Sequence, residues 1–279
     1  MGDSEGLAMD TSALALQMKR LSIWLDRSCQ PEGLVRRQFA TPPFGSCYLT
    51  LDPARQAPFA SSNYNRIHVC GTEPGLEPDG IERLIQQFQA AGVRRFFVWL
   101  SPGPDMHTVR GWLDRAGFSR IRRTGYPTLH RGSTAAARFT TDLQVREVTP
   151  DEIAGVRDLL GDTLAPEYAR SAGKPGFFHF MAFDGARPVA IASLCAFEGL
   201  GYLMAAATAE SDRKRGAQQA LIAGRIARAA QVGCSALVSE TLYMLEHSYR
   251  NLQRAGFQEA YEKEVYEWSS PESEEDDPQ

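Results

Sequence analysis

The stretch TAESDRKRGAQQALIAGRI, from Thr208 to Ile226, contains the end of an apolar segment, a polar turn and the start of a helix. Gly201–Ala207 before it carries no charge and predicts a buried strand, and apolar residues recur at helical spacing after Ala217. Three cations and one glycine, Arg213–Gly216, stand where the helix begins. The first N–H groups of a helix lack internal partners and carry the positive end of its dipole, so they attract anions. The turn therefore predicts a pyrophosphate cradle, although a solvated helix cap would have the same sequence.

The composition is that of a globular protein with one large or two ordinary domains: 279 residues, of which 43% are hydrophobic and 23% are charged. A net charge of -4 argues against a general nucleic-acid binder, because such proteins need a basic surface to displace phosphate counterions. No apolar run approaches the ~20 residues of a membrane span, and the N-terminal segment lacks the basic start and apolar centre of an export signal. We expect a cytoplasmic protein with neither a nucleic-acid nor a membrane partner.

Metal and disulfide chemistry find no support in the sequence. The five cysteines are odd in number, widely scattered and without a CxxC pair, which suits a reduced compartment and argues against disulfides and zinc. Cys70, Cys195 and Cys234 lie in apolar runs and are most simply small buried residues. The five histidines are equally isolated, so we expect no metal site.

Hydrophobic periodicity predicts a mixed α/β chain of two units. Residues 1–64 form an N-terminal extension that packs on the first unit, 65–131 the first unit, 132–142 a linker, 143–269 the second unit and 270–279 an acidic disordered tail. Expected helices cover residues 13–27, 78–91, 108–116, 149–160 and 246–255, in addition to the one after Gly216. Expected strands cover 46–51, 66–70, 95–100, 118–123, 126–130, 143–148, 177–183, 188–197, 199–207 and 235–239, with two more between Phe257 and Trp268.

An internal repeat runs through this order of elements. Strand, helix, strand, helix, Gly-Phe and strand occur twice, with Arg115–Phe118 (RAGF) matching Arg254–Phe257 and Gly92 matching Gly233. The repeat predicts a duplication that builds two similar half-sheets. A chance match of RAGF is the alternative, because Gly-Phe is common after helices.

The second unit, from Leu143 to Trp268, resembles the GNAT superfamily of acyl-CoA-dependent N-acyltransferases. The resemblance rests on the order β-α-β-β-β-α-β-α-β-β, on the Arg213-x-x-Gly216 turn after the fourth strand and on the segment from Asn251 to Gly256-Phe257. It implies an α/β fold with a mixed sheet, acetyl-CoA as co-substrate and transfer of an acetyl group to the primary amine of a small-molecule or peptide acceptor. A longer acyl group is a variant of this hypothesis, and the sequence leaves open whether the chain forms a homodimer.

The first unit looks like a degenerate GNAT-like half-copy. Its turn that corresponds to Arg213–Gly216 is Thr72–Pro78, where two glutamates repel a pyrophosphate and two prolines remove N–H donors. We therefore expect this copy to be structural or to shape an acceptor cleft.

The resemblance also implies how acetyl-CoA is held. In that family, backbone N–H groups of the turn bind the pyrophosphate, and the fourth strand splays from the fifth and offers backbone groups to the pantetheine. Gln218 departs from the usual glycine or alanine of the turn, which puts close approach of the pyrophosphate at that point in doubt. The implied cofactor-binding residues are Arg213, Lys214, Arg215, Gly216, Ala217, Gln218 and Gln219 in the turn, Ala206, Ala207 and Thr208 on the strand, and Asn251 on the late helix.

The catalytic residues are harder to assign from the sequence. Many relatives carry a tyrosine as general acid where this chain has Leu252, and a base must accept the proton of the attacking amine. The candidates for the acid are Tyr249 and Tyr243, and those for the base are Glu198, Glu240 and, third, His179. Each has a non-catalytic alternative: the tyrosines as packed aromatic residues, the glutamates as solvated charges at loop ends, and His179 as a structural residue. The rival hypothesis is therefore a non-catalytic acyl-CoA sensor or interaction scaffold.

Overall fold

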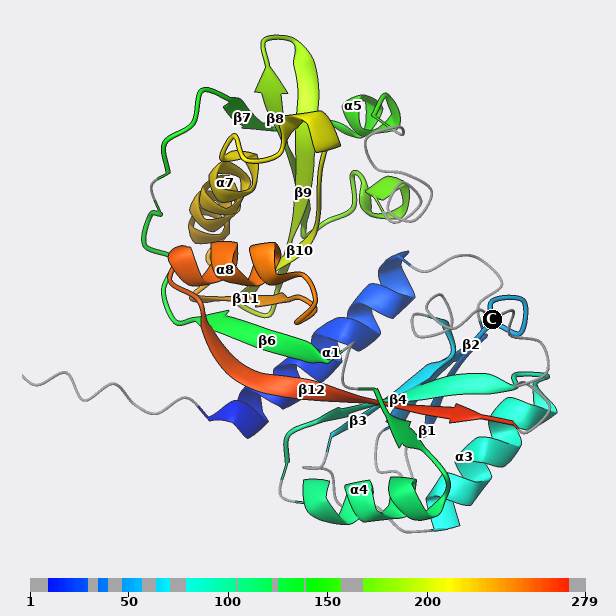
Figure 1. Cartoon of the computed structure of the whole chain (residues 1–279). Coiled ribbons are helices and arrows are strands. Elements are labelled where there is room, and N and C mark those ends of the chain that lie inside the picture. The colour runs from blue at the N-terminus through cyan, green and yellow to red at the C-terminus, as the bar shows by residue number, and fades with distance from the viewer. Residues whose placement is uncertain are drawn as a thin grey trace, which may run out of the picture. The chain divides into compact units, whose positions relative to one another are not determined.

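The computed structural model describes residues 10–29, 35–39, 47–56, 64–70, 79–103, 105–121, 125–137, 139–156 and 168–270 (Figure 1). The chain folds into two compact units. Unit 1 comprises Met1–Trp24, Pro31–Tyr126 and Ala260–Gln279, and unit 2 comprises Leu25–Gln30 and Pro127–Glu259. The predicted turn Thr72–Pro78 and the acidic tail from 271 onward lie outside the described residues. No helix of the described ranges is both long and apolar enough to cross a membrane.

Unit 1 is a mixed sheet with the helices α3 and α4 on one face. The strands follow the order β1-β2-β3-β4-β12, with β3 and β4 parallel and the other neighbours antiparallel. The helices α3 and α4 lie on the same face of this sheet (Figure 1), where Phe88 and Leu113 pack against Phe96 of β4 in one apolar core. The elements are α1 (Thr11–Cys29), β1 (Val35–Phe39), β2 (Cys47–Leu51), β3 (Arg66–Cys70), α3 (Asp79–Ala90), β4 (Arg95–Ser101), α4 (Met106–Arg115), β5 (Ser119–Arg120) and β12 (Gln258–Ser269).

Unit 2 is a second mixed sheet, of strand order β6-β11-β10-β9-β8-β7, in which β10 and β11 are the parallel neighbours. Its strands are β6 (Tyr126–Arg131), β7 (Gln144–Glu147), β8 (Phe177–Asp184), β9 (Arg187–Phe197), β10 (Leu200–Thr208) and β11 (Ala236–Glu240). Its helical elements are α5 (Pro150–Ala154), the short 3-10 helix η1 (Glu210–Asp212), α7 (Ala217–Gln231) and α8 (Glu246–Arg254).

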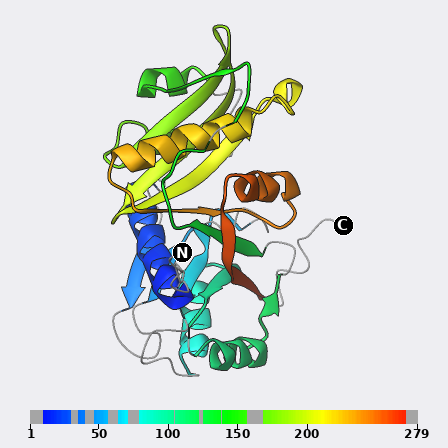
Figure 2. The same ribbon diagram turned by 90° about the vertical axis from the view of Figure 1, so that its left-hand side faces the viewer.

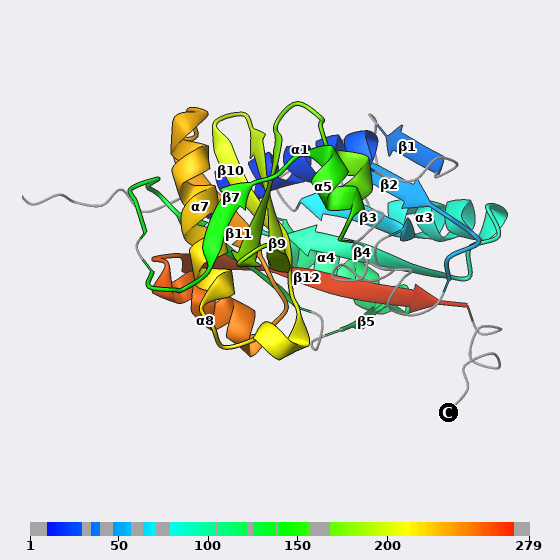
Figure 3. The same cartoon turned by 90° about the horizontal axis from the view of Figure 1, so that it is seen from above.

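Side chains of the unit 2 strands alternate between two layers, as strand geometry requires. On β8, Phe180 packs with Leu221 of α7, whereas the next residue, Met181, packs with Ile153 of α5. Figures 2 and 3 show α7 lying along one face of the strands, and Figure 3 shows α5 on the other face. Helix α7 is therefore fixed by the core, and its N-terminus is held at the end of β10.

The predicted start of α5 is confirmed. The Thr149 hydroxyl accepts the N–H of Glu152, and the Glu152 carboxylate accepts the N–H of Thr149, which is a capping box followed by Pro150 in the first turn. The helix ends at Ala154 rather than continuing toward Leu160, and residues 157–167 lie outside the described part of the chain.

The predicted repeat is present in the backbone. Each of the four matched helices ends at a glycine with positive φ, a conformation that other residues adopt only at a cost. The glycines are Gly92 (φ 76°) and Gly233 (φ 81°) after α3 and α7, and Gly117 (φ 82°) and Gly256 (φ 86°) after α4 and α8. The next N–H bonds back into the last helical turn each time, Val93 to Phe88 at 2.9 Å, Cys234 to Ala229 at 2.9 Å, Phe118 to Leu113 at 3.0 Å and Phe257 to Leu252 at 3.1 Å.

The C-terminal strands differ from the prediction. The expected pair of strands between Phe257 and Trp268 is one strand, β12, because no glycine or proline interrupts it. From Ala260 onward β12 is part of unit 1, since Glu264–Ser269 pairs with Leu100–Arg95 of β4, whereas the sequence placed these residues in the second unit. The expected strand 118–123 is described only as β5, and β1 was not predicted.

Candidate functional site

The unit 2 sheet opens between its two parallel strands. Pairing of β10 with β11 covers only Leu200–Tyr202, opposite Ala236–Val238, although both strands are fully described and β10 continues to Thr208. The Ser239 hydroxyl donates to the Leu203 carbonyl at 2.8 Å where the strands part. In unit 1 the matching strands stay paired along all of β3. The opening that the family resemblance implies is thus present in unit 2, whereas β3 and β4 of unit 1 stay joined.

A β-bulge lies on β10 just beyond the point where β11 departs. The register against β9 shifts between Met204 and Ala206, and the extra residue, Ala205, has a φ of 29°. Beyond the bulge, the Ala209 N–H bonds to the carbonyl of Val189 on β9. Backbone groups of an antiparallel strand alternate in direction, so those of Ala207 face β9 and those of Ala206 and Thr208 face the open edge. Two of the three predicted pantetheine residues therefore offer backbone groups to the opening.

The turn after β10 leads into the uncapped start of α7. Lys214 (φ 68°) and Gly216 (φ 81°) both have left-handed backbones, and Gly216 is the N-cap without a side-chain hydrogen bond. The Ala220 N–H makes the first bond of the helix, to the Gly216 carbonyl at 3.0 Å. The N–H groups of Ala217, Gln218 and Gln219 precede that bond and have no intrahelical partner. They are donors in the place predicted for a pyrophosphate.

The cations of the turn have different roles. The Arg215 guanidinium bonds to Asp142 at 2.6 Å, Asp184 at 2.7 Å and Asp212 at 3.0 Å. Arg187 also donates to the buried Asp212 carboxylate, at 2.8 and 2.9 Å. These hydrogen bonds hold the pKa of Asp212 well below the usual range. Arg215 thus anchors the turn through its side chain, and its cofactor contact through the backbone N–H stays a prediction.

Arg213 and Lys214 lie on the surface of the same turn. The Arg213 side chain is 64% exposed and lies 3.5 Å from the Glu210 carboxylate. An ion pair this exposed contributes little to stability. Lys214 is exposed as well. These are the two side chains of the turn that remain accessible to an anion.

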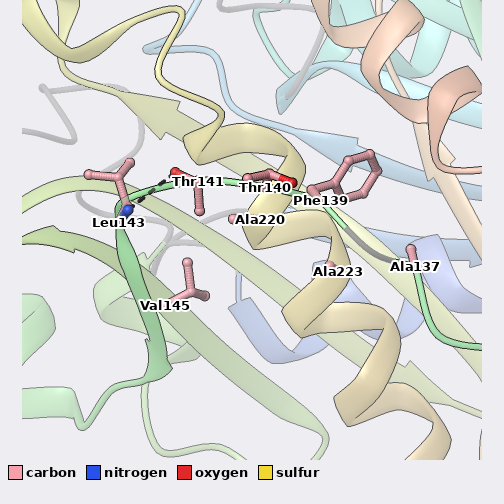
Figure 4. Close-up of a pocket in the computed structure, with 8 residues that line it drawn as sticks. All are labelled: Ala137, Phe139, Thr140, Thr141, Leu143, Val145, Ala220 and Ala223. Atoms are coloured by element: carbon pink, nitrogen blue, oxygen red, sulfur yellow. Dashed lines mark hydrogen bonds between the residues drawn. The ribbon is translucent and has the colours of Figure 1, made fainter.

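The predicted linker packs against the turn. The Thr141 hydroxyl donates to the Arg215 carbonyl at 2.9 Å, and a Cβ at Gly216 would lie 3.3 Å from the Thr140 carbonyl oxygen. The Gln218 amide, 3.5 Å from the Thr208 hydroxyl, connects the start of α7 to the end of β10. Between this segment and α7 lies an open cavity of about 580 Å³ (Figure 4). It is lined by Ala137, Phe139, Thr140, Thr141, Leu143, Val145, Ala220 and Ala223.

The two candidate bases lie on either side of the segment where β10 pairs with β11. Glu240 ends β11 beside the opening, where it is half-buried and accepts a hydrogen bond from the Thr128 hydroxyl at 3.0 Å. Glu198 is exposed in the tight turn between β9 and β10, at the end of β10 opposite the Arg213–Gly216 turn. Only Glu240 is placed near the open edge.

The candidate acids share one carboxylate. The hydroxyls of Tyr249 and Tyr243 donate to Glu259 at 2.6 and 2.8 Å, and this hydrogen bond raises the pKa of Tyr249 to about 12. Leu252 is buried in an apolar core, so no proton donor occupies the usual position. The side-chain oxygen of Asn251 lies 3.3 Å from Arg254.

The third base candidate, His179, lies in the core of unit 2. It is 3% exposed and hydrogen-bonds to Ser193 at 2.7 Å, and burial lowers its pKa. Among the described residues, no group of three or more histidines, cysteines or carboxylates is placed to hold a metal ion.

Comparisons with solved structures find the same arrangement of elements at low identity. A GCN5-related N-acetyltransferase from Kribbella flavida superposes with a TM-score of 0.65 at 17% identity, over 94% of this chain and 96% of that one. Another, from Sphaerobacter thermophilus, gives 0.60 at 12% identity over 93% and 92%. A tandem GNAT protein from the clavulanic acid biosynthesis pathway gives 0.56 at 10% identity over 89% and 87%. No protein-family model matches the chain, and neither does any curated protein.

Proposed function

Because the chain has the GNAT fold, which confirms the predicted fold class, we propose that it transfers an acetyl group from acetyl-CoA to the primary amine of a small molecule or peptide. One observation carries the proposal: β10 parts from β11 directly before an uncapped helix start flanked by two exposed cations. The opening exposes backbone donors and acceptors to an amide-bearing arm, and the helix start suits a pyrophosphate.

Acetyl-CoA would be held by backbone more than by side chains. The N–H groups of Gly216–Gln219 face the pyrophosphate, with Arg213 and Lys214 adding charge from the surface. The pantetheine amides pair with backbone groups of Ala206 and Thr208 at the open edge, much as a further strand would. Arg215 contributes by keeping the turn in place.

The reaction forms a C–N bond and breaks the C–S bond of the thioester. The amine attacks the thioester carbonyl, whose oxygen is polarised by a backbone N–H of the open edge. The proton of the attacking amine passes to Glu240 directly or through water. The sulfur leaves as CoA thiolate. Tyr249 is a weak acid for this thiolate, since its pKa of about 12 lies above the ~8.5 of an ordinary thiol.

A second function, an acyl-CoA sensor or scaffold, is favoured by one observation. Leu252 is buried where a general acid is expected, and the nearby tyrosine hydroxyls are held by Glu259. A sensor binds acetyl-CoA without consuming the thioester, whereas an enzyme releases CoA when an amine is supplied.

Calorimetry with acetyl-CoA tests the binding part of the proposal. We expect wild-type protein to bind and Lys214→Glu to bind at least about tenfold more weakly, which corresponds to ~1.4 kcal/mol. Lys174→Glu makes the same charge change at an exposed position before β8, where the ammonium donates to the Ser28 carbonyl, and the folded variant should bind acetyl-CoA like wild type. Absence of binding by wild type, or equal weakening by both variants, would overturn the cofactor assignment.

Turnover separates the enzyme from the sensor. Release of CoA is followed with a panel of primary amines, for wild type and for Glu240→Gln. The enzyme predicts amine-dependent release that falls at least about tenfold in the variant while acetyl-CoA affinity is unchanged. Binding without release for any amine would support the sensor, and unchanged release in the variant would remove Glu240 as the base.

A further inference from the structure

The bulge on β10 decides which backbone groups face the opening. Before the bulge, the backbone groups of even-numbered residues such as Met204, which pairs with Ser193, point toward β9. After the bulge, the backbone groups of the odd-numbered residues Ala207 and Ala209 point toward β9. Without the extra residue Ala205, the groups of Ala206 would turn toward β9 and the open edge would lose them. Every donor beyond Ala205 on this edge therefore depends on the bulge.

Two buried side chains hold the carbonyls that flank the bulge. The Tyr168 hydroxyl donates to the Ala205 carbonyl at 2.8 Å. The Arg225 guanidinium donates to the carbonyls of Met204 at 3.2 Å and Ser193 at 3.1 Å, one on each side of the strand pair. Ala205 keeps an unfavourable positive φ, which persists only where its surroundings fix it.

Arg225 is unusual because it is a buried cation bound to carbonyls. Arg225 is 3% exposed. Besides the two strand carbonyls, its guanidinium donates to the Leu221 carbonyl of its own helix. Burial lowers its pKa to about 10, so it remains charged at neutral pH. Among the described residues it has no carboxylate partner, so its charge acts on the bulge with little screening.

A second layer of hydrogen bonds fixes these contacts. His179 bonds to the Ser193 hydroxyl at 2.7 Å through Nδ1 and lies 3.4 Å from the Ser171 hydroxyl at Nε2. The Ser171 hydroxyl in turn donates to the Tyr168 carbonyl at 3.1 Å. The members of this network are at most 3% exposed, so neither Tyr168 nor Arg225 can shift without breaking a buried bond.

We infer that Arg225 and Tyr168 are positioning residues that hold the β10 bulge, so that the Ala206 N–H points at the thioester carbonyl oxygen while the Arg225 charge favours the developing oxyanion. The inference rests on the proposed acetyl transfer. Neither side chain touches the substrate, since both act through the carbonyls of Met204 and Ala205.

Kinetics of single variants test the inference. Tyr168→Phe removes only the hydroxyl and should lower kcat about tenfold, and Arg225→Met should lower it about 10²-fold, as loss or misplacement of an oxyanion donor does. The KM for acetyl-CoA should stay within about twofold of wild type, and Arg225→Lys should recover part of kcat. Arg228→Met is the control, because Arg228 lies on the same helix but pairs with Glu147 at 3.1 Å away from the bulge. A wild-type kcat in Tyr168→Phe and Arg225→Met, or an equal loss in Arg228→Met, would overturn the inference.

Amide hydrogen exchange gives a readout that does not need catalysis. Tyr168→Phe and Arg225→Met should each speed exchange of the Met204, Ala207 and Ala209 amides, which face β9, about tenfold or more and leave β11 unchanged. If wild type shows no turnover with any amine, the proposed function fails, and this exchange result alone decides whether the two residues hold the bulge. Unchanged exchange in a folded Tyr168→Phe protein would contradict the inference whatever the activity.

Discussion

Two glycines at opposite ends of α7 form a matched pair. Gly216 before the helix and Gly233 after it both have a φ of 81°. A Cβ at Gly233 would meet nothing within 4 Å, whereas one at Gly216 would lie 3.3 Å from the Thr140 carbonyl oxygen and 3.4 Å from the Thr141 Cβ. The same change to alanine therefore tests backbone strain at one site, and strain plus crowding of the anion-binding turn at the other.

The expected destabilisation follows from these contacts. A left-handed backbone costs a non-glycine residue about 1–2 kcal/mol, which is all that Gly233→Ala should lose. Gly216→Ala adds the cost of displacing residues 140–141, about 1–3 kcal/mol for an overpacked site. Urea denaturation should show Gly216→Ala to be less stable by at least about 1 kcal/mol, and its Tm lower by about 3 °C, relative to Gly233→Ala.

Acetyl-CoA binding supplies the functional half of the comparison. The crowding at Gly216 moves the N–H groups of Gly216–Gln219, so Gly216→Ala should bind acetyl-CoA about tenfold more weakly by calorimetry, and Gly233→Ala should bind like wild type. Equal stability and equal affinity of the two variants would show that the contact with residues 140–141 does not position the turn.

Three further predictions concern titrating groups. Glu259→Gln should return the pKa of Tyr249 from about 12 toward its ordinary 10, and ultraviolet titration of tyrosinate that finds no change would rule out the shared carboxylate. Burial lowers the pKa of His179, so its neutral form contributes stability that is complete above about pH 6.5 and is lost as pH falls through the folded pKa. Urea unfolding of His179→Gln should lose that acid-side slope, and an unchanged slope would contradict it. Burial raises the pKa of Cys195, so peptide mapping should find its thiol alkylated only in urea; modification in the native protein at pH 8 would disagree.

The parts of the site that follow from local sequence could be predicted. An apolar strand, a cationic turn and a helix start need only neighbouring residues, and the turn at Arg213–Gly216 lies where the pattern placed it. The helix-ending glycines of the repeat were also readable, because only glycine adopts their backbone easily.

The parts that depend on distant residues could not be predicted. Arg215 pairs with Asp142 and Asp184, which are 73 and 31 residues away, so its anchoring role left no local mark. The bulge at Ala205 lies in a run of alanines, with no glycine to signal it. Nothing in the local sequence separates Glu198 from Glu240, because only the pairing of β10 with β11 shows that Glu240 lies just beyond the point where the strands part and Glu198 before the paired segment.

The roles of the aromatic and buried polar residues were hidden for the same reason. Tyr249 lies one helical turn before Leu252, where a tyrosine could replace the missing acid. Its hydroxyl, however, donates to Glu259 on the following strand. In the sequence, Arg225 looks like any other cation on a helix. Only its position against the sheet lets it donate to the carbonyls of two strands. A single buried arginine in an otherwise apolar helical face was the signal available for it.

In the proposed complex, acetyl-CoA lies across the start of α7 and the open edge of β10. Titration of isotope-labelled protein with acetyl-CoA, followed through the backbone amide resonances, shows where the cofactor binds. We expect saturable shifts at Gly216–Gln219, Ala206 and Thr208, and none at the Glu198–Gly199 turn. Shifts confined to that turn or to unit 1, or no shifts at all, would contradict it.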